Sequence, residues 1–249
     1  MARVNNLSKS KHFCILRTQK IKSAVGITRA LKHNSRTVQP DNANPEKTSL
    51  NTYFNSFEEA LELYRKKLPE KIRKNAVHAI EVLITASPEA LEKMTKKEQI
   101  RYFNESVKWA ETVLGGRENL LSACIHRDEA TPHLHIIFMP LKDKKLNANY
   151  YIGGSRNRMI ELQDDFYNTV GKKFNLERGL PKAITKAKHL KSRDYLAQKG
   201  QQLAQKEQEL DEQEKNLIAQ KNAIIKFTNA LSAFKQKELK RELEREFGR

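Results

Sequence analysis

The sequence contains only two cysteines in 249 residues, Cys14 and Cys124. Their separation matches no metal-binding or redox motif, and so few cysteines give no disulfide framework, which fits a reducing cytoplasm. No apolar run is long enough to span a bilayer, and the N-terminal MARVNNLSKSKHF lacks the apolar core of a signal peptide. We therefore expect a cytoplasmic protein without a stable membrane span.

Acidic residues are also scarce relative to basic ones. The chain has 47 Lys and Arg against 30 Asp and Glu, a formal net charge of +17. This excess indicates a polyanionic partner, either nucleic acid or an acidic membrane surface, and the missing membrane features favour nucleic acid. Basic side chains bind a DNA backbone without reading its sequence, so they do not explain recognition of one site.

The pattern of apolar residues predicts an α+β fold, an antiparallel sheet with helices on one face. At 249 residues the chain can bury one sizeable core plus an extension, or two small domains. Residues 33–52 are rich in Asn, Pro, Ser and Thr and indicate an irregular loop. We expect strands at 12–18, 79–86, 119–127 and 133–141, and helices at 57–67, 87–116 (one long or broken helix) and 159–174.

The C-terminal part has a different pattern, which suggests a domain of residues 1–185 followed by a long charged helix, 186–249. Large aliphatic residues recur every seven positions, whereas the positions three further on are polar until Phe227 and Phe234. Both a coiled-coil dimer and a single exposed helix remain open. The repeating residues are Leu196, Leu203, Leu210, Leu217, Ile224 and Leu231.

A cluster of metal-ligand side chains lies in IHRDEATPHLHIIFMP, residues 125–140. His133 and His135 point to one face of an extended strand, and His126 can lie opposite them across the hairpin. Three imidazoles leave coordination positions open for water or substrate. Asp128 and Glu129 can orient the ligand imidazoles. The cluster predicts a metal site, whereas we expect structural roles for His12, His78 and His189.

The pattern H-x-D-E-x-x-P-H-x-H resembles the third motif of the MobV (Mob/Pre) family of plasmid mobilisation relaxases, within the HUH endonuclease superfamily. ALKHNSR is similar to the first motif of the family, H-N-x-R, and SLNTYF resembles the L-N-Y segment that follows it. Further similar segments are IRKNAVHAIEVLITAS and NLERG, so that the resemblance covers residues 10–185. One departure is Tyr53, which stands one residue later than the family order has it.

This resemblance implies a relaxase that nicks one DNA strand at a plasmid origin of transfer and stays attached to the 5′ end, initiating conjugative transfer. The implied nucleophile is His33, with Glu129 as the proton acceptor; Tyr53, Tyr150 and Tyr151 are competing nucleophiles. Imidazole ligands favour Mn²⁺, Co²⁺ or Zn²⁺ over Mg²⁺, and we expect Mn²⁺. The residues expected to bind DNA are Asn34, Arg36, Asn51 and Arg73.

The implied partners are origin DNA, as a single strand with a hairpin, a second copy bound through the C-terminal helix, and a conjugative coupling protein. Three other functions stay open. The chain could be another metal-dependent phosphoesterase that uses water as nucleophile, or a rolling-circle replication initiator that uses a tyrosine. It could also be a non-enzymatic basic DNA-binding protein.

Overall fold

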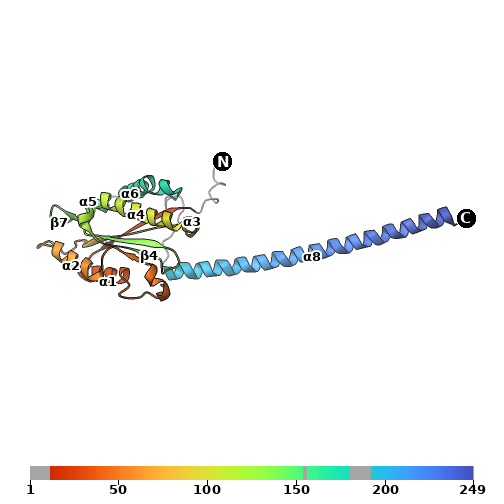
Figure 1. Ribbon diagram of the computed structural model, residues 1–249, viewed down its shortest axis with the longest axis horizontal. Coiled ribbons are helices and arrows are strands. Elements are labelled where there is room, and N and C mark those ends of the chain that lie inside the picture. The colour runs from red at the N-terminus through yellow and green to blue at the C-terminus, as the bar shows by residue number, and fades with distance from the viewer. Residues whose placement is uncertain (1–11, 154–155, 180–191, 249) are drawn as a thin grey trace. The chain divides into compact units, whose positions relative to one another are not determined.

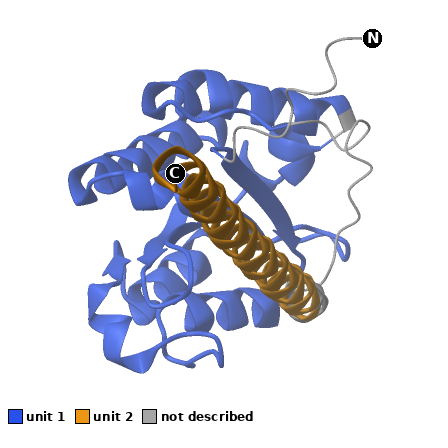
Figure 2. Ribbon diagram, turned by 90° about the vertical axis from the view of Figure 1, so that its right-hand side faces the viewer, with its two compact units in different colours: residues 1–185 blue, residues 186–249 orange. Residues whose placement is uncertain are grey.

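The computed structural model describes residues 12–153, 156–179 and 192–248. The chain divides into two compact units, residues 1–185 and 186–249, coloured separately in Figure 2. The elements of the first unit, in chain order, are β1 (Cys14–Ile21), α1 (Ala24–Asn34), η1 (Pro45–Leu50), β2 (Thr52–Tyr53), α2 (Phe57–Lys67), β3 (Ala79–Ala86), α3 (Pro88–Lys93), α4 (Lys96–Val113), η2 (Arg117–Asn119), β4 (Leu120–His126), β5 (His133–Phe138), β6 (Leu141–Lys142), β7 (Lys145–Leu146), α5 (Ala148–Ile152), α6 (Arg156–Thr169) and η3 (Gly171–Phe174).

The centre of this unit is a five-stranded antiparallel sheet in the order β1-β3-β5-β4-β2. β4 and β5 form the predicted hairpin, and β3 pairs with the other side of β5. The predicted α+β class and antiparallel sheet are therefore confirmed. A second, two-stranded sheet joins β6 to β7.

Helices cover both faces of the sheet, so the expectation of helices on one face only was wrong. In Figure 1, α4, α5 and α6 lie on one side and α1 and α2 on the other. The reason is that residues 24–67 form two helices, α1 and α2, and only α2 was predicted. Each group of helices packs on an apolar surface of the sheet, and the strands have such a surface on each face.

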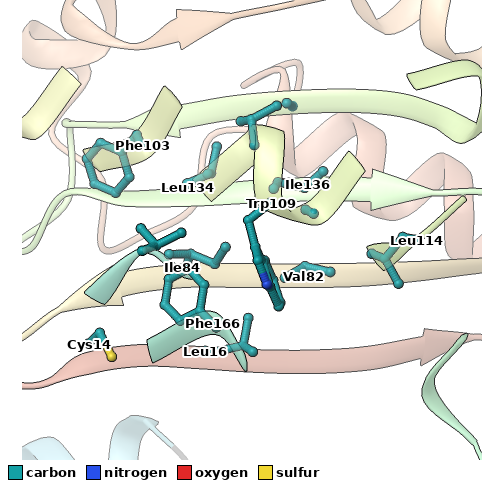
Figure 3. Packing of buried hydrophobic residues seen from close by; sticks show 14 of the residues in the cluster. Cys14, Leu16, Val82, Ile84, Phe103, Trp109, Leu114, Leu134, Ile136 and Phe166 are labelled. Atoms are coloured by element: carbon teal, nitrogen blue, oxygen red, sulfur yellow. The ribbon is translucent and has the colours of Figure 1, made fainter. Parts of the chain in front are cut away.

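The larger core lies between the sheet and α4, α5 and α6. Alternate residues of β3 and β5 point into it, among them Ile84, Leu134 and Ile136 (Figure 3). From the helices, Trp109 and Phe166 meet edge to face with ring centroids 4.9 Å apart, and the Trp109 Nε1–H donates to Asp165 Oδ2. Burial of these side chains is the main source of stability for the fold.

Capping residues set the helix boundaries near the sheet. Ser23 begins α1 by accepting a hydrogen bond from the Gly26 N–H, and Ser56 begins α2 with a capping box that includes Glu59. The predicted helix at 87–116 is broken into α3 and α4, because Thr95 starts a new capping box with Glu98. The short segment around Tyr150 and Tyr151 is the helix α5.

The second unit contains one described element, α8 (Ser192–Phe247), a helix of 56 residues. From Gly200 to Gly248 every residue is exposed, including the aliphatic residues of the seven-residue repeat from Leu203 to Leu231. Leu196 and His189 fall outside the side chains that the structure describes. In the part of the chain that is described, no helix has both the length and the apolarity needed to cross a bilayer.

Candidate active site

The register of the β4–β5 hairpin brings the three predicted ligand histidines together. His126 pairs directly with His133, and His135 pairs with Cys124, two positions before His126. The ring centroids are 5.2 Å apart for His126 and His133, 5.0 Å for His126 and His135, and 4.9 Å for His133 and His135. All three imidazoles therefore meet over the sheet face that α1 covers.

Each of the three imidazoles has one ring nitrogen bonded to a protein acceptor. Nε2 of His126 lies 2.9 Å from the Asn34 carbonyl oxygen, and Nδ1 of His133 lies 2.8 Å from the Thr131 carbonyl oxygen. Nδ1 of His135 lies 3.0 Å from Glu81 Oε1. Because each acceptor fixes a proton on the nitrogen that faces it, the lone pair of a neutral ring is on the other nitrogen.

The free nitrogens fit a metal site. Nδ1 of His126 is buried and has no hydrogen-bond partner among the described residues, an arrangement that is costly unless a ligand satisfies it. A histidine that holds a metal through one nitrogen and donates from the other is the usual arrangement in proteins. In each of two sets, three possible ligand atoms lie within 4.8 Å of one another: one set is His33, His126 and His135, and the other is His126, Glu129 and His133. Neither set contains all three of the predicted ligand histidines.

Burial favours the neutral form of the imidazoles of His126, His133 and His33. It lowers the pKa of His126 to about 3, with further lowering by the charges of His135 and Arg36. Burial also lowers the pKa of His133 and that of His33. Since metal binding and nucleophilic attack both need an unprotonated nitrogen, these directions suit both roles near pH 7.

His33 joins the cluster from the last turn of α1, a helix that we had not predicted. Its ring centroid lies 5.7 Å from that of His126 and 5.6 Å from that of His135. Ile27 and Leu31, buried on one side of α1, anchor the helix against the sheet. His33 thus lies beside His126 and His135 although more than ninety positions separate it from them in the sequence.

A buried ion pair fixes the chain directly after His33. Arg36, with a left-handed φ of 58°, donates from Nε and Nη2 to the two oxygens of Asp128 at 2.8 and 2.7 Å, and from Nη2 to Glu129 Oε1 at 2.7 Å. Its Nη1 also donates to the His33 carbonyl oxygen at 3.2 Å. The Arg36 and Asp128 side chains are almost completely buried, at 2% and 0% exposure. The bidentate pair therefore ties the segment that follows His33 to the turn between β4 and β5.

Asp128 has a different role from the one predicted. Both of its oxygens bond to Arg36, and Oδ2 also accepts from Asn51 Nδ2 at 2.8 Å, so no hydrogen bond from a ligand histidine is found among the described residues. Burial favours the neutral acid, but the hydrogen bonds from Arg36 and Asn51 outweigh it and hold the pKa of Asp128 well below its usual value. Asp128 supports the turn instead of a ligand imidazole.

The carboxylate that contacts a histidine of the cluster, His135, is Glu81 of β3, which was not predicted from the sequence. Its position opposite Ile137 in the β3–β5 register makes it the diagonal neighbour of His135 on the same sheet face. An acid inside the apolar run AIEVLITA was the available signal, because a charged residue in a central strand needs a partner. Which residue would be that partner depends on the strand pairing.

Glu129 lies at the centre of the cluster. Its Oε1 is 3.8 Å from His133 Nε2 and 4.0 Å from His126 Nδ1, and its Oε2 accepts from Asn42 Nδ2 at 2.6 Å. Its negative charge acts on His33 as well, raising the pKa of His33 against the effect of burial. Glu129 is therefore placed to accept a proton or to ligate a metal.

The competing tyrosines lie in other surroundings. Tyr53 of β2 is 39% exposed, and its hydroxyl accepts from Asn51 Nδ2 at 3.2 Å. Burial raises the pKa of Tyr53, which makes its phenolate harder to form. Tyr151 belongs to the core on the opposite face of the sheet and donates to the Leu141 carbonyl oxygen, and the neighbouring ring of Tyr150 packs edge to face on it. The sheet thus separates both α5 tyrosines from the histidines.

The four residues predicted to bind DNA also divide by environment. The side chains of Arg36 and Asn51 form hydrogen bonds to other parts of the protein, so they are not free for phosphate contacts. Arg36 donates to Asp128, and Asn51 Oδ1 accepts from the Arg127 N–H at 2.6 Å. Asn34 is 1% exposed, and its side-chain amide has no partner among the described residues. Arg73 is exposed and donates to the Leu146 carbonyl oxygen at 3.1 Å. Of the four, only Arg73 presents its side chain at the surface.

Comparison with proteins of known sequence identifies a family. A family model described as plasmid recombination enzyme, Mob_Pre, matches residues 10–197. The type 1 plasmid recombination enzyme of Staphylococcus aureus is 31% identical over 192 residues, 70% of this chain and 46% of the relative. A plasmid recombination enzyme of Bacillus thuringiensis is 37% identical over 115 residues, 45% of this chain and 25% of the relative. The chain thus spans less than half the length of these relatives.

Solved structures of similar fold give the same family. A Mn-bound crystal structure of the MobM relaxase domain with 23-nucleotide plasmid oriT DNA superposes with a TM-score of 0.63 at 26% identity, covering 76% of this chain and 98% of that domain. A second Mn-bound complex of MobM, with 22-nucleotide DNA, gives a TM-score of 0.62 at 26% identity over 74% of this chain and 99% of that domain. Because the family model covers most of the chain, the protein belongs to the Mob/Pre family of plasmid recombination enzymes.

Proposed function

We propose that this protein is a plasmid mobilisation relaxase, which nicks one DNA strand at an origin of transfer and remains attached to the 5′ end through His33. The observation that carries the proposal is the convergence of four imidazoles, one of which, His126, has a buried free Nδ1. The ring centroids of His126, His133 and His135 lie 4.9 to 5.2 Å apart, and that of His33 lies 5.7 Å from His126 and 5.6 Å from His135. Burying a polar nitrogen without a partner lowers stability, and DNA binding alone does not require it, which favours a catalytic role.

The proposed ligands are His126, His133 and His135. Their neutral nitrogen donors suit Mn²⁺, as in the MobM complexes, better than Mg²⁺, with Co²⁺ and Zn²⁺ as further candidates. A bound divalent ion supplies charge neutralisation at the phosphoryl oxygens and orientation of the phosphate for in-line attack. Glu81 would hold the His135 ring in the tautomer whose Nε2 faces the ion.

The proposed nucleophile is the free imidazole nitrogen of His33. The new bond joins this nitrogen to phosphorus, the bond from phosphorus to the 3′ oxygen breaks, and the DNA ends are a 3′ hydroxyl and a phosphoramidate on the protein. The attacking ring becomes a cation and loses its other proton, for which Glu129 is the proposed acceptor, and the leaving 3′ oxygen takes up one proton from water, so the proton count balances. Arg36 acts as a positioning residue, because it holds the His33 carbonyl oxygen and Glu129 at the same time.

The remaining partners follow from the same proposal. The net charge of +17 favours the origin DNA, single strand and hairpin, as substrate, with Arg73 as an exposed cation for the backbone. The exposed residues of α8 support association of two copies and leave room for a conjugative coupling protein. A cytoplasmic location would place the enzyme with its plasmid DNA.

Origin-containing single strands with Mn²⁺, separated on denaturing gels, would test the proposal. We expect a slower band in which DNA is joined to protein, and mass spectrometry of the trapped adduct should find the DNA on His33. Cleavage with free ends on both fragments would instead indicate water as the nucleophile. An adduct on Tyr53 would favour a replication-initiator type of reaction.

A further inference from the structure

We infer that α8 joins two copies of this chain as an antiparallel coiled coil with Leu217 and Gln220 at its centre. The proposal concerns residues 203–234 and is independent of the chemistry proposed for the active site. One observation on which it rests is a row of exposed aliphatic residues on a helix that has no other described element in its unit. The members of the row are Leu203 (61% exposed), Leu210 (60%), Leu217 (67%), Ile224 (65%) and Leu231 (44%).

These residues occupy the a positions of five consecutive heptads, and the matching d positions change in character along the helix. The first three d residues are polar, Lys206, Gln213 and Gln220, and the last two are Phe227 and Phe234, which are 69% and 61% exposed. The seam is long enough for a coiled coil, which needs about three to four heptads. The asymmetry between its two halves decides the direction of pairing.

A parallel pair would place identical residues opposite each other. Lys206 would then face a second Lys206 inside the seam, and Gln213 and Gln220 would each face their own copies. Such layers contain no apolar side chain, and the lysine layer brings two like charges together. Three of the five d layers would therefore oppose association.

An antiparallel pair places an a residue of one helix opposite a d residue of the other. With Leu217 opposite Gln220 of the second copy, Leu210 packs on Phe227 and Leu203 on Phe234. The polar d residues Lys206 and Gln213 then meet Leu231 and Ile224. Every layer then contains at least one apolar side chain. The two phenylalanines of one helix pack against Leu210 and Leu203 of the other, in the half of the helix whose d residues are polar.

Charge along the helix favours the same direction. Residues 203–216 contain five acids and two lysines, whereas residues 221–234 contain two lysines and no acid. In the antiparallel register these two segments lie against each other, net negative against net positive. In a parallel pair each would lie against its own copy, with Glu209 beside Glu214 of the second helix. Flanking charges of this kind set the orientation of coiled coils.

Spin-label distances on the full chain would test the direction of pairing. Gln208 and Asn222 both lie on the outer f positions, and the native Cys14 and Cys124 are buried. In the antiparallel register Gln208 lies opposite residue 229 and Asn222 opposite residue 215, offsets of 21 and 7 positions. At about 1.5 Å per residue, the labels at 208 are separated by about 30 Å along the axis, and those at 222 by about 10 Å.

We therefore expect a dimer by sedimentation and a clearly longer distance for Gln208→Cys than for Asn222→Cys. Equal distances would mean parallel pairing, and a protein that stays monomeric at micromolar concentration would overturn the proposal altogether. Leu210→Lys should weaken the dimer at least tenfold, whereas Gln208→Lys, on the outer face, should leave it unchanged. A dimer that resists Leu210→Lys would use another surface and would also contradict the proposal.

Discussion

The two faces of the central sheet differ in chemistry, although the same strands build both. On β5, Leu134, Ile136 and Phe138 point into the core beneath α4 and α6, whereas His133 and His135 point toward α1. The first face carries the larger apolar core, whereas the second combines a smaller apolar cluster with polar groups whose burial is costly. Alternation along a strand lets one six-residue segment serve both purposes, because neighbouring side chains do not share an environment.

The sharpest test of this division is His33→Ala. The variant removes the proposed nucleophile and should abolish the DNA–protein adduct, while the free energy of unfolding should change little because His33 is only partly buried. Denaturing gels measure the first quantity and urea titration the second. An adduct that persists in this variant would exclude His33 as the attacking residue.

A core substitution should have the opposite effect. Ile136→Ala removes a completely buried side chain from the apolar face and should lower the free energy of unfolding by about 2–5 kcal/mol. Ile136→Val, the matched control, should cost about 0.5–1.5 kcal/mol. At temperatures where Ile136→Ala stays folded, Mn²⁺ affinity should remain close to that of the original protein; a large loss would mean that the two faces are coupled.

Glu81→Gln tests whether the acid in the apolar strand belongs to the site. The change keeps the shape of the side chain but removes the charge that orients His135, so Mn²⁺ affinity should fall about 10- to 100-fold. Mn²⁺ at a hundredfold excess over its dissociation constant should stabilise the unaltered protein by about 2.7 kcal/mol. Glu105→Gln, which removes an ion pair with Lys173 remote from the histidines, serves as the control and should bind Mn²⁺ normally.

The stability of the metal-free protein should depend on pH through the site face. Burial lowers the pKa of His126 to about 3, so the unfolded chain takes up a proton near pH 6.5 that the folded protein does not. The contribution of His126 to the free energy of unfolding is therefore fully present above pH 6.5. It is lost as the pH falls toward 3, by roughly 1 kcal/mol for each pH unit. Thermal unfolding at pH 7.5 and 5.5 measures it, and equal stability at both values would contradict a buried neutral His126.

The smallest effect is expected for Tyr53→Phe. The hydroxyl of Tyr53 accepts one hydrogen bond from Asn51, and Asn51 keeps its bonds to Asp128 and to the Arg127 N–H without it. Adduct formation should therefore stay within about twofold of the original rate, a change below about 0.5 kcal/mol. Loss of the adduct in this variant, with His33 intact, would return Tyr53 to the role of nucleophile.

Local sequence was a good guide where one element carried the signal. The helix at 57–67, the strand at 79–86 and the hairpin that contains His126, His133 and His135 were all predicted from the types and spacing of their own residues. The pairing of Arg36 with Asp128, ninety-two positions apart, was not visible, since charge alone does not choose between many acids and bases. The helix α1 was not predicted either; its residues lie between a strand and a loop rich in Asn and Pro.

The sequence by itself determined the class of fold and the placement of three candidate ligand histidines on one hairpin. Three histidines at fixed spacing on a hairpin converge whatever the rest of the chain does, because strand pairing within a hairpin is local. Only the tertiary structure decided that α1 brings His33 to the site, that Glu81 orients His135, and that Asp128 holds Arg36. Each of these contacts joins segments more than fifty residues apart, and their partners are chosen by strand register and helix packing together.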